Sequence, residues 1–141
     1  MNRFWRMWLA GWSLLVVLVG LGMVAVALPG AEPGYIWLFA RLGEAPGEVT
    51  PALRETAAVL GAVCIGWGAS LAVVFRVLAQ LPAVAARSAW RQLTGAVLLW
   101  FGIDSACSLA FGFPGNAIGN SVLLLLFLVP AMAMQFGRPA G

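Results

Sequence analysis

Histidine and lysine are both absent from this chain of 141 residues, and charged residues make up only 9% of it. Without histidine, the chain lacks the commonest metal ligand and the usual proton carrier near neutral pH. Soluble domains carry about 25% charged residues, so this chain has too few charges to cover a surface that faces water. The sequence also contains no HExxH metal motif and no phosphate-binding loop.

These absences predict that the protein is not an enzyme, that it binds no cofactor and that it has no metal site. Its two cysteines, Cys64 and Cys107, both fall in apolar sequence. A disulfide between them is conceivable, but buried thiols that behave as small hydrophobic groups are the simpler interpretation. The eight arginines form no basic stripe, so nucleic acid is not an expected partner.

Long apolar runs, in contrast, fill most of the chain. Hydrophobic residues make up 62% of it, and the mean hydropathy is +0.97. A helix of about 20 residues covers the ~30 Å hydrocarbon core of a bilayer. Four runs come close to that length: Met7–Leu28, Thr56–Phe75, Gln92–Gly112 and Ala117–Phe136.

The sequence therefore predicts an all-α fold, a single transmembrane domain over residues 1–141 that forms an antiparallel up-down bundle of four helices. The helices are expected at about residues 5–28, 52–79, 89–112 and 117–136, with an outer loop at residues 29–51. Thr50 and Pro51 are typical of a helix start, and Ser88 is expected to cap the third helix. Pro130 falls inside the fourth helix and removes one of its backbone hydrogen bonds.

The arginines predict the orientation of the helices, because short cytoplasmic segments are enriched in positive charge. Arg41 lies in the outer loop and Arg54 lies just after it, and four glutamates accompany them. The other arginines fall on the opposite side: Arg3, Arg6, Arg76, Arg87, Arg91 and Arg138. Both termini are therefore expected in the cytoplasm. Arginine without lysine is a habit of GC-rich bacterial genomes, so a bacterial inner membrane is the expected location.

Two segments leave alternatives open. The first run follows basic residues and contains Ala25-Val26-Ala27, which resembles a signal-peptide cleavage site, although the run is longer than a signal peptide needs. In the outer loop, the stretch Tyr35–Leu42 is too short to span a membrane. An interfacial segment is the simpler interpretation of this stretch, and a binding lid is the alternative.

Tryptophans recur on one face of the first helix, at positions 5, 8 and 12, and Trp90 is expected at the same level. Tryptophans enriched at membrane interfaces form an aromatic belt, which is the simpler interpretation. A stripe reserved for a protein partner or a pigment is the alternative. Small residues, such as Gly61, Gly66 and Gly68, indicate where helices approach closely.

Asp104 is the only charged residue inside the four runs, and polar residues are expected around it. Ser108 lies one helical turn further on, and Asn120 is expected at the depth of Ser108. Such a group could bind a small cation, a proton or a polar ligand, or it could be a hydrogen-bond clasp between two helices. The candidate site comprises Asp104, Ser108, Asn116, Asn120, Ser121, Trp67 and Trp100.

Two functions fit these observations. The first is a structural or accessory subunit of a larger membrane assembly, because the chain is small and lacks a catalytic set of residues. Its partners would be the lipid bilayer and other membrane-protein subunits or further copies of itself. The second is a small, oligomeric transporter or channel, in which Asp104 binds a proton, a cation or a small polar ligand.

Overall fold

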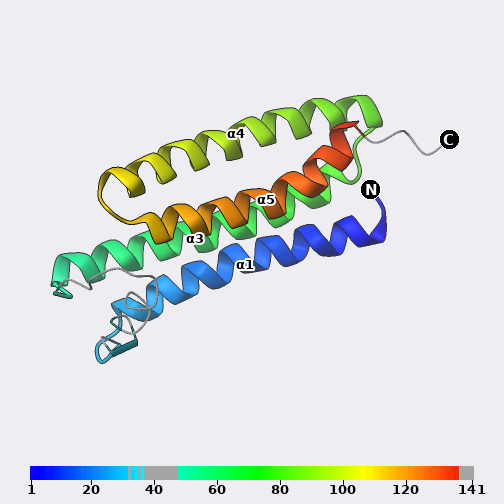
Figure 1. Cartoon of the computed structure of the whole chain (residues 1–141). Helices are drawn as coiled ribbons and strands as arrows, with labels where there is room; N and C mark the ends of the chain where they lie inside the picture. The colour runs from blue at the N-terminus through cyan, green and yellow to red at the C-terminus, as the bar shows by residue number, and fades with distance from the viewer. Residues whose placement is uncertain (32, 35, 37–47, 137–141) are drawn as a thin grey trace. The chain divides into compact units, whose positions relative to one another are not determined.

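The computed structural model describes residues 1–31, 33–34, 36 and 48–136. Four long helices account for most of these residues (Figure 1). Each is long and apolar enough to cross a membrane, which confirms the all-helical fold and the four candidate spans. Apart from Ile36, the stretch Tyr35–Leu42 lies outside the described residues. The helices are α1 (Arg3–Ala27), α3 (Pro51–Leu78), α4 (Ala83–Ala110) and α5 (Pro114–Phe136).

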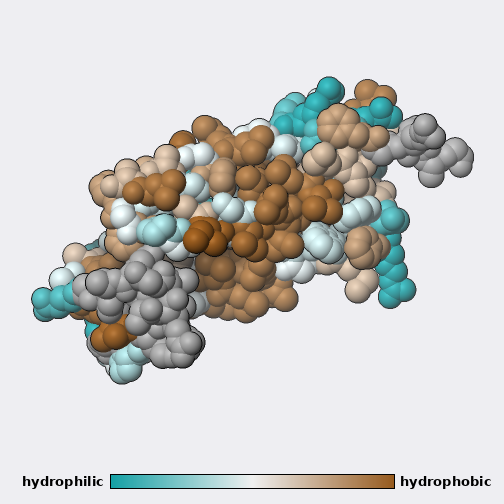
Figure 2. All heavy atoms as spheres, in the orientation of Figure 1, coloured by the Kyte–Doolittle hydropathy of each residue, from teal (hydrophilic) through white to brown (hydrophobic). Residues whose placement is uncertain are grey.

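The exposed side chains of the helices are largely apolar, as lipid-facing helices require. Leu99 is 65% exposed, Ile118 is 67% exposed and Leu125 is 62% exposed. Figure 2 shows hydrophobic side chains along the lengths of the helices, and hydrophilic ones over the start of α4. The helices are therefore compatible with a small membrane protein that crosses the bilayer several times.

Local sequence explains where the helices begin. At the start of α3, the Thr50 hydroxyl accepts a hydrogen bond from the Leu53 backbone N–H at 3.2 Å, and Pro51 is the first helical residue, as predicted. The start of α4 differs from its prediction, because the helix begins at Ala83 and Ser88 lies within it. The residues between them are mainly alanine and arginine, which are strong helix formers.

The chain divides into two compact units. The first unit comprises residues 1–12 and 72–141, and the second comprises residues 13–71. The first unit contains α4, α5, the start of α1 and the end of α3. The second contains the rest of α1 and α3. Cys64 is partly buried and Cys107 is exposed, so the interpretation of both as buried thiols is wrong for Cys107.

In the second unit, α1 and α3 approach closely at glycines. A Cβ atom added to Gly61 would lie 2.6 Å from the carbonyl oxygen of Gly20. One added to Gly68 would lie 2.9 Å from the carbonyl oxygen of Ser13. Gly66 has open space instead, with no atom within 4 Å of an added Cβ. Gly61 and Gly68 therefore permit the close approach of α1 and α3, as predicted, whereas Gly66 takes no part in it.

In the first unit, four buried aromatic residues, one from each helix, form an aromatic layer: Trp12, Phe75, Trp90 and Phe127. The rings of Phe75 and Trp90 are stacked, with centroids 5.7 Å apart and planes at 14°. Phe127 contacts the other three rings at centroid distances of 5.6 Å, 6.4 Å and 6.2 Å. The aromatic-belt interpretation is wrong for Trp12 and Trp90, because both are inside the protein, at 3% and 2% exposure.

Two indoles of α1 donate hydrogen bonds to backbone carbonyls of α5. Trp12 Nε1 donates to the Leu123 oxygen, and Trp8 Nε1 donates to the Leu126 oxygen, both at 2.8 Å. Proline has no backbone N–H, so Pro130 cannot donate to the carbonyl four residues before it, which is that of Leu126. Trp8 therefore supplies the hydrogen bond that Pro130 removes from α5.

This pairing predicts that the effect of changing Trp8 depends on Pro130. Trp8→Phe keeps an aromatic ring but leaves the Leu126 carbonyl without its donor, and should lower the free energy of unfolding by about 1–3 kcal/mol. In a Pro130→Ala background, the new N–H at position 130 serves that carbonyl, so Trp8→Phe should have at most half of this effect. Thermal unfolding of the four proteins in detergent measures the coupling. Simple additivity of the two changes would contradict it.

Candidate functional site

The α4–α5 connection places the candidate polar residues beside one another. α4 ends in a Schellman motif, in which the Phe113 N–H bonds to the Ser108 carbonyl at 2.8 Å and the Gly112 N–H bonds to the Leu109 carbonyl at 3.2 Å. Gly112 has a positive φ of 82°, which glycine adopts without strain. Pro114 then begins α5 at once, so α5 packs back against α4.

Three polar residues meet across this connection, which we call the polar clasp: Asp104, Ser108 and Asn116. Asn116 Nδ2 donates to Asp104 Oδ1 at 2.8 Å and to Ser108 Oγ at 2.7 Å. Ser108 Oγ in turn donates to the Asp104 carbonyl oxygen at 2.7 Å and lies 3.3 Å from Asp104 Oδ1. Ser108 is buried, Asp104 is partly buried and Asn116 is exposed. The clasp therefore joins α4 to α5 near the end of the helix pair.

Asn120 contacts Ser105 and not Ser108, the residue whose depth it was expected to share. Its Nδ2 lies 3.4 Å from Ser105 Oγ, and both residues are buried. Ser105 is about one helical turn deeper in α4 than Ser108, so the prediction that Asn120 and Ser108 share a depth is wrong by that turn. The predicted start of α5 was three residues too late, because the first residue of this helix is Pro114 and not Ala117.

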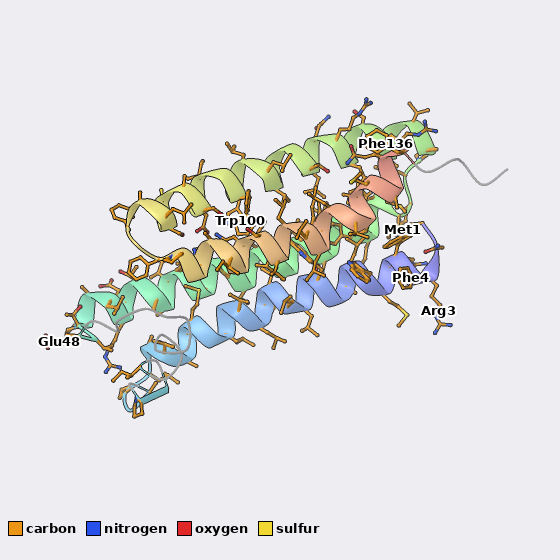
Figure 3. All side chains as sticks on the ribbon, in the orientation of Figure 1. Met1, Arg3, Phe4, Glu48, Trp100 and Phe136 are labelled. Atoms are coloured by element: carbon orange, nitrogen blue, oxygen red, sulfur yellow. The ribbon has the colours of Figure 1, made fainter. Side chains whose placement is uncertain are left out.

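The remaining predicted site residues are Ser121, Trp100 and Trp67. Ser121 Oγ donates to the Ala117 carbonyl of its own helix at 2.8 Å. Trp100 lies on α4, one turn before Asp104, and is partly buried (Figure 3). Trp67 lies on α3 in the second unit, and is also partly buried.

The chemistry open to the clasp is set by the Asp104 carboxylate. Both amide hydrogens of Asn116 and the hydroxyl hydrogen of Ser108 are used within the clasp. Among the described residues, Asp104 Oδ2 has no hydrogen-bond donor, and no arginine pairs with the carboxylate. Nor do the described residues contain a group of three or more side chains suited to a metal ion. The clasp is therefore a helix-joining network in which two side-chain oxygens, Asp104 Oδ2 and Asn116 Oδ1, accept no hydrogen bond from a described residue.

A further polar contact between α4 and α5 was not predicted. Gln135 Nε2 donates to Thr94 Oγ1 at 2.9 Å, and Thr94 Oγ1 donates to the Trp90 carbonyl of its own helix at 2.8 Å. Gln135 is a rare polar side chain in the fourth apolar run, which is the one signal that could have indicated a contact here. The contact between Gln135 and Thr94 joins α4 and α5 at the end of the helix pair opposite to the clasp.

These features define a small multi-pass membrane protein, because each of the four helices is long and apolar enough to cross a bilayer. No known protein family, no curated protein and no solved structure matches the chain.

Proposed function

We propose that the protein is a non-catalytic accessory subunit of a larger membrane assembly, placed in a bacterial inner membrane with both termini in the cytoplasm. The main support is the polar clasp, because its side-chain donors all bind acceptors within the clasp itself. Asn116 donates twice and Ser108 once, and every acceptor belongs to the clasp. Such a network fixes the geometry of two helices and leaves few groups to recognise a soluble substrate.

The outer face of α4 adds support. Gly95, Gly102 and Ala106 are all exposed, and their spacing sets them within about 40° of one another on the helix. No atom lies within 4 Å of a Cβ added to Gly95 or Gly102. Small residues at helix surfaces in membranes allow another helix to pack closely. In this proposal, a helix of a partner subunit packs against α4 in that way.

A second candidate, a small transporter or channel, is favoured by one observation. Asp104 Oδ2 has no donor among the described residues, and an ionised carboxylate within a membrane normally has a partner or reaches water. In this candidate, a cation or a proton binds at that oxygen. The two functions differ in what they require of the negative charge of Asp104.

Asp104→Asn separates the two functions, because asparagine retains an acceptor oxygen for Asn116 but carries no charge. For an accessory subunit, we expect the variant to co-purify with the same partners in mild detergent and to unfold at nearly the wild-type temperature. Asn116→Leu is the matched control, since it removes two clasp hydrogen bonds and should lower the free energy of unfolding by about 1 kcal/mol.

The transporter predicts another pattern. The wild-type protein alone in proteoliposomes would carry a cation or proton flux, and Asp104→Asn would abolish that flux while leaving the fold intact. A protein that purifies alone from native membranes and carries a flux that depends on Asp104 would replace the accessory function with the second candidate. A protein that purifies alone and carries no flux would contradict both.

A further inference from the structure

Five arginines lie at one end of the first unit: Arg3, Arg6, Arg76, Arg87 and Arg91. All five are exposed, and none forms a hydrogen bond or an ion pair through its side chain with a residue that the structure describes. The only acidic residue in the sequence of the first unit is Asp104, which is about 20 Å along α4 from Arg91. This end of the unit is therefore strongly positive and uncompensated.

The aromatic layer fixes how three of these arginines are arranged. Phe75 of α3 and Trp90 of α4 stack face to face, so each points at the other helix. Arg76 follows Phe75 and Arg91 follows Trp90, and each is therefore turned about 100° away from the ring before it. The last turns of α3 and the first turns of α4 run in opposite directions, across a connection at residues 79–82 (Figure 1).

Opposite chain directions make these two rotations converge. From Phe75 to Arg76, the side-chain direction rotates by about 100° about the axis of α3, and from Trp90 to Arg91 it rotates by the same angle about the axis of α4. Because the two helices run in opposite directions and the two rings face each other, both rotations lead to the same side of the helix pair. Arg76 and Arg91 therefore lie on that side. Arg87 precedes Trp90 by three residues, which places it within about 40° of Arg91 on α4. All three side chains thus begin on one side of the pair, within about 5 Å of the aromatic stack along the helix axes.

We propose that Arg76, Arg87 and Arg91 form a binding site for the phosphate of an anionic phospholipid headgroup. A guanidinium donates two parallel hydrogen bonds to phosphate oxygens, and exposed arginines beside membrane-spanning helices are suited to acidic headgroups. The acyl chains of the lipid would run from the arginines towards the middle of the helices, along exposed apolar side chains of α3 and α4, where Val73 is 57% exposed and Leu98 is 45% exposed. The site thus offers cationic and apolar surface to the two parts of one lipid.

The test is lipid binding to the full chain in mild detergent, measured by native mass spectrometry with phosphatidylglycerol and with phosphatidylcholine of the same acyl chains. We expect phosphatidylglycerol to bind more tightly. Arg76→Gln/Arg87→Gln/Arg91→Gln should weaken its binding on the order of a hundredfold and abolish the preference. The corresponding triple lysine variant, which keeps the charge but not the paired donors, should keep the preference for phosphatidylglycerol but bind it less tightly than the wild type does.

Arg3→Gln/Arg6→Gln is the control, because it removes exposed positive charge from the same unit but not from the α3–α4 pair. This control should keep phosphatidylglycerol binding within a few-fold of wild type. Equal binding of the two lipids would overturn the proposal, as would a loss in the control as large as in the triple glutamine variant. Competition by millimolar inorganic phosphate would assign the arginines to a free anion instead of a lipid.

Discussion

Alanine in place of Gly61 is expected to destabilise the protein, whereas alanine in place of Gly66 is expected to leave its stability unchanged or to raise it. Both glycines lie in α3 and gain the same methyl group. At Gly61 the added Cβ would lie 2.6 Å from the Gly20 carbonyl oxygen and 2.9 Å from the Val24 nitrogen, so the backbones of α1 and α3 must separate. Overpacking of this kind typically lowers the free energy of unfolding by about 1–3 kcal/mol.

Gly66 supplies the matched control because it is exposed and has no atom within 4 Å of an added Cβ. There the higher helix propensity of alanine contributes up to about 1 kcal/mol in favour of the fold. The two variants should therefore shift the thermal unfolding midpoint in detergent in opposite directions. Equal shifts would show that α1 and α3 do not approach each other at Gly61 as described here.

The contrast between these two glycines shows what the sequence can and cannot predict. Composition alone predicted the four helices, because only long apolar runs can cover a hydrocarbon core, and the structure has a helix over each run. The glycines were equally good candidates for a close helix contact. Which of them faces a neighbour depends on the rotation of α3 about its axis, and the sequence of α3 does not fix that rotation.

The polar clasp was predictable in part for a similar reason. A tight connection and a one-turn spacing indicated that Asp104, Ser108 and Asn116 lie close together, and all three do. The partner of Asn120 was not predictable, because a shift of a few residues in the start of α5 moves every later contact by a turn. Register between helices is set by the Schellman turn and Pro114 together, and only the structure shows how they combine.

The tryptophans were misinterpreted because indole suits two environments. A ring with one N–H is stable at a membrane interface, and it is equally stable inside a protein when the N–H finds an acceptor. Trp12 donates its indole N–H to the Leu123 carbonyl, and Trp8 donates its own to the Leu126 carbonyl, which Pro130 leaves without a donor. Nothing in the spacing of the tryptophans along α1 could reveal that acceptors on α5 lie opposite them.

Phe127→Ala is expected to be the most damaging substitution in the first unit. The Phe127 side chain is fully buried and contacts the rings of Trp12, Phe75 and Trp90, which come from three other helices. Truncation leaves a cavity where those rings lose packing partners, and typical losses for a buried phenylalanine are about 3–5 kcal/mol. Because the lost contacts join all four helices, we expect cooperative loss of the fold at a lower temperature.

Leu125→Ala is the control, two residues earlier on the same helix and 62% exposed. In a membrane, lipid tails contact an exposed leucine as well as protein would, so its truncation should change the unfolding midpoint little. Tryptophan fluorescence during thermal unfolding measures both variants, since Trp12 and Trp90 lie in the affected layer. If the two variants unfold alike, the aromatic layer does not hold the four helices together.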